Sequence, residues 1–205
     1  MTDGNHDIFR GLEQYAGADF ACVAADPPWR FKSNSAEKPG RNAARHYATM
    51  TLAEIEALPV RDVIAKDCIL WFWITGPLLV KGAHIPIMRA WGFEPTAVGF
   101  TWVKLNRNAQ KLFFMQQDIF LGGGFTTRKN AEFCLIGKRG KSLRQSASVR
   151  EVILSPLREH SRKPDEFFEA VEKYSAGSRI ELFGRQSRPG WTVLGFEATK
   201  FDEVR

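Results

Sequence analysis

The four consecutive residues Asp26-Pro27-Pro28-Trp29 combine an acid, two rigid turn residues and a large aromatic ring. The Asp26 carboxylate can accept one N–H of an amino group, and the Pro27 carbonyl, which the prolines hold in place, can accept the other. Trp29 can stack on a planar base. Together they would hold an amine on an aromatic ring so that its nitrogen lone pair faces an electrophile. The alternative is a rigid turn after a strand, with Trp29 covering the core.

The segments around this motif predict an α/β fold. An apolar run at residues 20–25 ends at Asp26 and is typical of a buried parallel strand. Further strands are expected at residues 68–74, 96–103, 132–136, 151–154, 179–183 and 192–196, and helices at about 51–58, 78–92 and 164–177. Strands that alternate with helices indicate a mostly parallel sheet, and a chain of 205 residues suits a single domain over residues 1–205.

Two long polar stretches interrupt this pattern, at residues 31–45 and 106–129. Long segments without secondary structure in a compact domain are usually functional or disordered. The first stretch comes just after the carboxyl end of a predicted strand, which is where open α/β sheets bind ligands. We therefore expect the site to lie at this edge of the sheet.

The chain is basic, with a net charge of +6 and a pI of about 9.4, which favours a polyanionic partner such as nucleic acid or an anionic membrane. Basic residues in and near the long stretches are expected to flank the pocket, where phosphates must pass if a base is to enter it. They are Arg41, Arg45, Lys104, Arg107, Lys111, Arg128, Lys129, Lys138, Arg139, Lys141, Arg144 and Arg150. For any single one, a solvated surface charge is the alternative.

Cys22, Cys68 and Cys134 lie far apart in apolar runs and show no zinc-ligand spacing, so we expect buried, reduced thiols and no metal. No apolar stretch is long enough to cross a bilayer, and the first residues show no signal-peptide pattern. We therefore expect a cytoplasmic protein without a membrane partner.

Taken together with the acid–proline motif, six further segments resemble the MT-A family of adenine methyltransferases in its short bacterial and phage form. They are His46-Tyr47-Ala48-Thr49-Met50, Leu70-Trp71-Phe72-Trp73-Ile74-Thr75-Gly76, Trp102-Val103-Lys104, Glu132-Phe133-Cys134-Leu135-Ile136-Gly137, His160-Ser161-Arg162-Lys163-Pro164-Asp165-Glu166 and Ile180-Glu181-Leu182-Phe183-Gly184-Arg185. The resemblance implies a Rossmann-like, S-adenosylmethionine-dependent methyltransferase fold, with helices on both faces of the sheet and a permuted motif order. The implied reaction is methylation of the 6-amino group of adenine.

The resemblance also implies the residues of the site. The catalytic loop, which would hold the target adenine, is Asp26, Pro27, Pro28 and Trp29. The substrate would further be contacted by Arg45, His46, Tyr47, Lys104 and Arg128. The cofactor, S-adenosylmethionine, would be held by Asp7, Ile8, Asp26, Lys163, Phe183, Gly184 and Arg185. In this scheme Lys163 neutralises the carboxylate of the cofactor, beside a helix N-terminus that suits an anion, and Gly184 lets the backbone approach the cofactor closely.

The chain departs from the family pattern at two places near the cofactor. It has Gln186-Ser187-Arg188 where relatives have Pro-His-Asn, and Phe196-Glu197 where relatives have Asn-Gln. Some polar contacts to the cofactor must therefore differ. The candidates for them are Ser187, Arg188 and Glu197.

DNA is the expected substrate and partner, because the chain shows no zinc finger, RNA-recognition module or heptad extension and so resembles the bacterial and phage members. The same reaction on adenosine in RNA stays open. A catalytically inactive nucleic-acid-binding subunit is a further alternative, which the intact motif and Lys163 disfavour. A methyltransferase for a protein amide is disfavoured by the basic surface and by Asp26, because those enzymes have Asn there. Both a monomer and a homodimer are compatible with the sequence.

Overall fold

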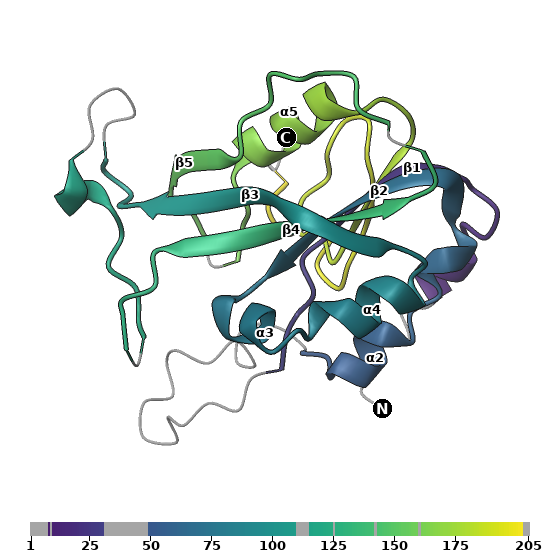
Figure 1. The fold of residues 1–205 in the computed structure, drawn as a ribbon, viewed down its shortest axis with the longest axis horizontal. Coiled ribbons are helices and arrows are strands. Elements are labelled where there is room, and N and C mark those ends of the chain that lie inside the picture. Colours follow the sequence, from purple (N-terminus) through teal and green to yellow (C-terminus); the bar gives the residue numbers. More distant parts are fainter. Residues whose placement is uncertain are drawn as a thin grey trace.

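The computed structural model describes residues 8, 10–30, 49–109, 115–124, 126–141, 143–159 and 161–202. At its centre is a seven-stranded sheet in the order β5-β3-β4-β2-β1-β6-β7. The strands are β1 (Phe20–Ala25), β2 (Ile64–Ile74), β3 (Glu94–Leu105), β4 (Ala131–Arg139), β5 (Val152–Pro156), β6 (Arg179–Leu182) and β7 (Thr192–Leu194). The helices α2 (Leu52–Glu56), α3 (Gly76–Val80) and α4 (His84–Ala90) cover one face, and α5 (Asp165–Tyr174) covers the other (Figure 1). The predicted α/β fold with a mostly parallel sheet is confirmed.

The direction of the strands brings several chain segments to one edge of the sheet. β1 pairs in parallel with β2 and β6, and β4 runs antiparallel to β2 and β3. The carboxyl ends of β1, β2, β3 and β6 therefore point to the same edge, and β4 starts there. Ala25 pairs with both Phe72 and Leu182, and Ile74 pairs with Phe133. This register places Asp26, which follows Ala25, and Glu132, which precedes Phe133, at that edge.

Some predicted elements have different bounds in the structure. The helix expected at residues 78–92 is divided into α3 and α4, because the chain turns between them at Gly82, whose φ is +67°. A capping box begins α2: Thr51 Oγ1 accepts from the Glu54 backbone N–H at 3.2 Å, and the Glu54 carboxylate accepts from the Thr51 N–H at 2.7 Å. Two short 3₁₀ turns, Val60–Asp62 and Gln116–Asp118, were not predicted.

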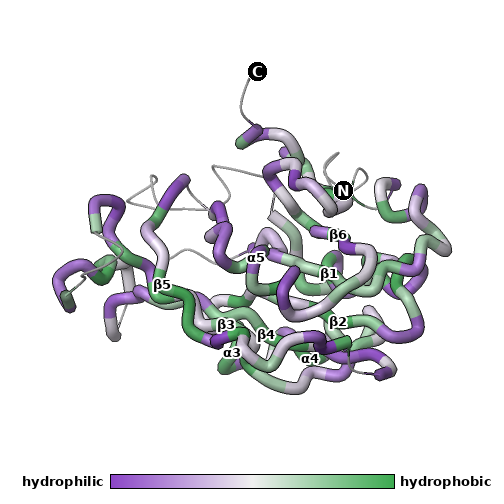
Figure 2. Tube along the Cα trace, turned by 90° about the horizontal axis from the view of Figure 1, so that it is seen from above, coloured by the Kyte–Doolittle hydropathy of each residue, from purple (hydrophilic) through white to green (hydrophobic). Residues whose placement is uncertain are grey.

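The continuous apolar run of β2 follows from its central position in the sheet. Trp71 and Trp73 face α5, where their rings lie 4.9 Å from Phe100 and 5.0 Å from Phe167 respectively. Phe72 faces the opposite layer, under α2 and α4. A strand that is covered on both faces needs no polar alternation. Figure 2 shows the same arrangement, with the central strands mostly apolar and hydrophilic residues concentrated in the surrounding loops.

The three cysteines are core residues. Cys22, Cys68 and Cys134 are buried and unpaired, as predicted. Burial raises the pKa of Cys22 to about 12, so this thiol stays neutral. Among the described residues, no helix has both the length and the apolar character that a membrane span requires.

The packing of α4 on β4 depends on a glycine. A Cβ atom added at Gly137 would lie 2.7 Å from Met88 Cε and 3.0 Å from Phe93 Cβ. Both of these side chains are fully buried, so neither can move aside without disturbing the core.

We expect Gly137→Ala to lower the free energy of unfolding by about 1–3 kcal/mol, the usual cost of overpacking a core. Gly123→Ala is the matched control, because nothing lies within 4 Å of a Cβ at that position. Denaturant unfolding of both variants, followed by tryptophan fluorescence, measures the difference. Equal midpoints for the two variants would contradict the close approach of α4 to β4.

Candidate active site

The turn that follows β1 is fixed by backbone hydrogen bonds. The Trp29 N–H donates to the Pro27 carbonyl at 2.8 Å, and the Met50 N–H donates to the Pro28 carbonyl at 2.8 Å. The Arg30 N–H in turn donates to the Met50 carbonyl at 3.1 Å, so Trp29 and Met50 form an isolated parallel bridge. The Pro27 carbonyl keeps a second lone pair with which it can accept from a further donor.

Trp29 is placed differently from the expectation. Its side chain is only 5% exposed, and its ring packs edge-on against Phe72 at 5.6 Å in the core. The ring therefore offers no open face on which a base could stack. A turn with two prolines has few backbone donors of its own, and the buried indole anchors it to the sheet.

Asp26 is the first member of a row of alternating charges, which we call the charge row: Asp26, Lys163, Glu132 and Lys104. The Lys163 ammonium lies 2.5 Å from Asp26 Oδ2 and 3.2 Å from Glu132 Oε2. The Lys104 ammonium lies 2.5 Å from the other oxygen, Glu132 Oε1. Ser161 Oγ donates to Asp26 Oδ2 at 3.5 Å. Four segments thus meet here: the turn after β1, the loop before α5, the start of β4 and the end of β3.

The pKa values within the charge row are strongly coupled. Burial raises the pKa of Asp26, which Lys163 opposes and Glu132 reinforces. Burial also raises the pKa of Glu132, but Lys163 and Lys104 outweigh it and lower this pKa to about 2. Burial alone would lower the pKa of Lys163, but the two carboxylates hold it above its ordinary value. Glu132 and Lys163 are therefore charged at neutral pH, and Asp26 has the higher proton affinity of the two acids.

Aromatic rings line the buried side of the charge row. The Lys163 ammonium lies 5.3 Å from the centre of the Trp73 ring, and the Lys104 ammonium lies 5.0 Å from the centre of the Trp102 ring. Both indoles belong to the core on the α5 face of the sheet. The rings shield the two cations from water and add a cation–π attraction.

This geometry gives two of the predicted site residues, Lys104 and Lys163, partners within the protein. Lys104 was expected to contact the substrate, but its ammonium pairs with Glu132 and its side chain is only 19% exposed. Lys163, which was expected to neutralise the cofactor's carboxylate, lines the polar side of the site, is 8% exposed and lies between two carboxylates of the protein, so its cofactor role stays a prediction. Sequence spacing does not show that Glu132, at the start of β4, lies between these two lysines.

Two adjoining hollows open beside Asp26 at the carboxyl edge of the sheet. The first encloses about 390 Å³ and has apolar walls formed by Pro28, Phe183 and Phe196. The second encloses about 370 Å³ and is lined mainly by polar and charged side chains: Asp26, Ser161, Arg162, Lys163, Glu181, Arg185, Gln186 and Arg188. Open α/β sheets bind ligands at this edge. We call the two hollows together the cleft.

Most of the predicted cofactor residues of the C-terminal segments lie in or beside the cleft. Phe183, Arg185, Arg188 and Glu197 all line it, and Arg185 pairs with Glu197 at 2.6 Å. Gly184 is also required for the packing of the sheet. A Cβ at Gly184 would lie 2.3 Å from Val193 Cγ1, so this glycine lets β6 and β7 approach each other.

Other predicted site residues lie outside the cleft. Ile8 is 2% exposed and packs in the core. The Ser187 backbone N–H donates to Asp202 at 2.7 Å, and its exposed side chain does not line either hollow. Arg128 is exposed in the connection between β3 and β4, outside both hollows. The remaining ones, Asp7, Arg45, His46 and Tyr47, lie outside the described residues.

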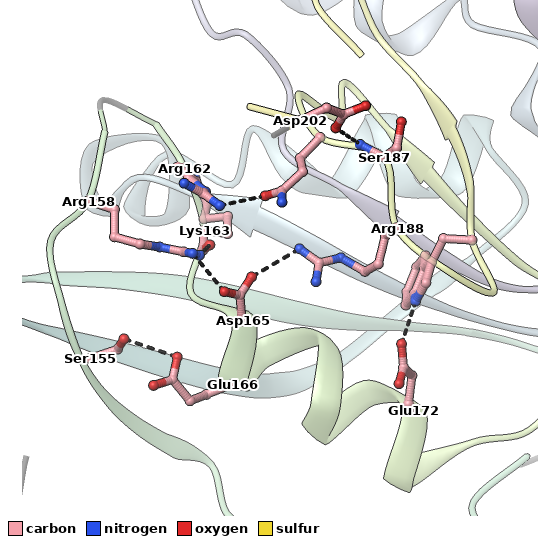
Figure 3. A network of polar contacts seen from close by, with 12 residues as sticks. Ser155, Arg158, Arg162, Lys163, Asp165, Glu166, Glu172, Ser187, Arg188 and Asp202 are labelled. Carbon is pink, nitrogen blue, oxygen red and sulfur yellow. Dashed lines mark hydrogen bonds and ion pairs between the residues drawn. The ribbon is translucent and has the colours of Figure 1, made fainter. Parts of the chain in front are cut away.

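The loop that carries Lys163 is held by a network around Asp165, at the start of α5 (Figure 3). Arg158 donates to Asp165 Oδ2 at 2.6 Å and to the Lys163 carbonyl at 2.6 Å. Arg188 donates to Asp165 Oδ1 at 3.2 Å and lies 3.6 Å from the centre of the Phe168 ring. One carboxylate thus ties the loop before α5 to the segment after β6, on either side of the polar hollow.

Glu181 is a site residue that the sequence analysis missed. Its carboxyl group lines the polar hollow, and burial raises its pKa from 4.5 to about 7. Perturbed acids in clefts are candidates for function. The available signal was an acid between the apolar residues Ile180 and Leu182 of a strand, next to the carboxyl edge of the sheet.

The basic residues at the end of β4 and just after it lie at the wrong edge of the sheet to flank the cleft. Because β4 is antiparallel to β2, its end pairs with the beginning of β2, and Arg139 lies beside Cys68. The Lys141 N–H donates to Asp67 at 2.8 Å, close to the same place. The expectation that Lys138, Arg139 and Lys141 flank the pocket is therefore wrong.

Comparison with known proteins agrees with this geometry. The family model MT-A70 matches residues 20–197. A type II methyltransferase, M.MunI of a Mycoplasma species, is 31% identical over 196 residues, which cover 87% of this chain and 77% of the relative. The N(6)-adenosine-methyltransferase catalytic subunit METTL3 of Homo sapiens is 34% identical over 182 residues, covering 86% of this chain and 28% of the relative. An MT-A70-like N(6)-adenosine-methyltransferase of Drosophila melanogaster is 32% identical over 191 residues, covering 91% of this chain and 28% of the relative.

The chain spans about a quarter of the length of the two animal relatives and about three quarters of the Mycoplasma one. The family match extends from β1, which leads into the acid–proline turn, to Glu197 at the far wall of the cleft. It includes the charge row and the residues of both hollows except Phe201. The chain therefore belongs to the MT-A70 family, the S-adenosylmethionine-dependent methyltransferases that act on the N6 position of adenine.

Proposed function

We propose that this protein transfers a methyl group from S-adenosylmethionine to the 6-amino group of adenine in DNA. The observation that carries the proposal is the place of Asp26, which borders both hollows and is held there by Lys163. DNA is preferred over RNA because the chain matches 77% of the length of a type II methyltransferase. We further propose that residues 1–205 form one methyltransferase domain that acts in the cytoplasm.

Asp26 performs the main step by orienting the amine. The exocyclic amine of adenine is a poor nucleophile, because its lone pair is delocalised into the ring. The Asp26 carboxylate accepts one N–H of the amine, and the free lone pair of the Pro27 carbonyl accepts the other, which turns the nitrogen lone pair towards the methyl donor. As the N–CH₃ bond forms and the S–CH₃ bond breaks, the nitrogen becomes positive and releases a proton. Burial raises the pKa of Asp26, so this carboxylate suits the proton.

The residues of the cleft fit the cofactor. S-adenosylmethionine, when bound, supplies the electrophilic methyl group on its sulfonium. Phe183 and Phe196 form apolar walls that suit its adenine ring, and the Glu181 carboxyl group suits the ribose hydroxyls. Arg188 has a guanidinium on the polar hollow and suits the cofactor's carboxylate, because the charge of Lys163 is already matched by two acids of the protein.

We expect Asp26→Asn to reduce methyl transfer by about tenfold to a hundredfold or more, because an amide cannot replace a charged acceptor held by Lys163. Transfer of labelled methyl groups to adenine-containing DNA measures the effect. Binding of S-adenosylhomocysteine, measured by calorimetry, should remain detectable. Asp62→Asn, an exposed acid of the 3₁₀ turn after α2, is the matched control. Turnover by Asp26→Asn equal to that of the control would contradict the mechanism.

Glu181 links the stability of the protein to pH. Its pKa of about 7 exceeds the ordinary 4.5, so the folded protein holds this proton more tightly than the unfolded chain. Stability should therefore fall as the pH rises from about 4.5 to about 7. We expect the free energy of unfolding of Glu181→Gln to exceed that of the wild type by up to about 3 kcal/mol at about pH 8. At about pH 4 the two values should differ little. The same variant should bind S-adenosylhomocysteine more weakly. Thermal unfolding measures the stability difference between the variant and the wild type. The same stability difference at both pH values would refute the link between Glu181 and pH.

Two assays test whether the substrate is DNA or RNA and how the target adenine reaches Asp26. A base stacked in a duplex cannot bring its amine to Asp26, so adenine must be flipped out or already single-stranded. We expect 6-methyladenine in DNA rather than in a matched RNA pool, after incubation with labelled cofactor. Binding should be tighter for adenine opposite a mismatch, because unpairing then costs less. Labelling of RNA alone would assign the reaction to RNA, and equal binding of matched and mismatched duplexes would contradict base flipping.

A further inference from the structure

Lys104 stands at the end of the charge row that lies farthest from Asp26. It lies near the carboxyl end of β3, where its backbone N–H donates to the Asn130 carbonyl at 2.8 Å. Glu132 lies on the neighbouring strand, directly beside Trp102 in the register of β3 and β4. The Lys104 side chain passes over the Trp102 ring and reaches Glu132 Oε1 at 2.5 Å. The two strands thus bring this lysine and this acid together.

The charge row is balanced only when all four members are present. Asp26 and Glu132 supply two negative charges, and Lys163 and Lys104 supply two positive charges, in alternation. Each oxygen of Glu132 accepts from a different lysine. Without the Lys104 charge, two acids would compete for the single ammonium of Lys163 in a poorly solvated place. Competition of this kind is strong where the effective dielectric constant is low.

We propose that Lys104 is a positioning residue for Asp26, which acts through Glu132 and Lys163. Its ammonium satisfies one oxygen of Glu132, and Lys163 is then shared between Glu132 and Asp26. Asp26 is thereby kept ionised and oriented towards the amine. This inference rests on the proposed methyl transfer, because its readout is the reaction that Asp26 performs. It replaces the expectation that Lys104 contacts the substrate.

The pH dependence of the reaction should report this coupling. The charged groups that act on Asp26 are Lys163, Glu132 and Lys104, and Glu181 acts on it from β6. All of these except Lys104 remain in a Lys104→Met variant. Removing one positive charge favours the protonated form of Asp26, so the acidic limb of the rate profile should move to higher pH.

The experiment compares Lys104→Met with Lys104→Arg, which keeps the charge, and with Lys138→Met, an exposed lysine at the opposite edge of the sheet. We expect Lys104→Met to lower kcat at least tenfold and to shift the acidic limb upwards, whereas Lys104→Arg recovers most of kcat. The KM for DNA and the dependence of DNA binding on salt should stay those of the wild type. A salt dependence reduced by about one phosphate contact with an unchanged kcat would overturn the proposal, because it would make Lys104 a phosphate contact.

A double-mutant cycle separates positioning from a general loss of structure. If Lys104 acts through Glu132, then Lys104→Met should have little further effect on kcat in a Glu132→Gln background. The double variant removes both partners of the pair, so no buried charge is left without a counter-ion and folding is favoured. Effects that multiply fully in the double variant would overturn the proposal. Absence of transfer by the wild type on DNA and on RNA would instead refute the proposed function, because every outcome that overturns the inference is measured against an active wild type.

Discussion

The site depends on two ion pairs of one buried lysine. The ammonium of Lys163 lies between the carboxylates of Asp26 and Glu132. A buried charge is tolerated only with partners of opposite sign in good geometry. Here the partners come from the turn after β1 and from the start of β4, and Lys163 comes from the loop before α5. Three segments that are distant in the sequence are thus fixed relative to one another by one cation. The turn after β1 cannot move away from the sheet edge without breaking the ion pair between Asp26 and Lys163.

The surroundings of Lys163 keep its loop in place at some conformational cost. Asp165 anchors the loop through Arg158, and the same carboxylate binds Arg188 on the other side of the cleft (Figure 3). Ser161 and Phe183, which both line the cleft, have φ values of +66°. Residues other than glycine rarely adopt this backbone conformation. Strain of this kind persists only where neighbouring contacts determine the backbone, and it is common at functional sites.

The fold could largely be predicted, because local signals agreed with one another. The apolar run before Asp26 indicated a strand that the structure contains, and the helices expected at about 51–58 and 164–177 correspond to α2 and α5. The failures have local causes. One continuous helix is predicted over residues 78–92, but the chain turns at Gly82. The direction of β4 was not visible in the sequence either, because hydrophobic periodicity is the same for parallel and antiparallel strands.

By itself, the sequence determined the family, the acid–proline turn and most of the cleft residues of the C-terminal segments, because these are contiguous motifs with a fixed chemical meaning. Only the tertiary structure decided which charges meet. The antiparallel β4 brings Glu132 to the site and carries Lys138 and Arg139 to the opposite edge. Lys104 and Lys163, which sequence reasoning assigned to phosphates and to the cofactor, thereby pair with an acid of the protein. The physical reason is that a side chain's partner depends on strand direction and register, and these are set by contacts between segments far apart in the chain.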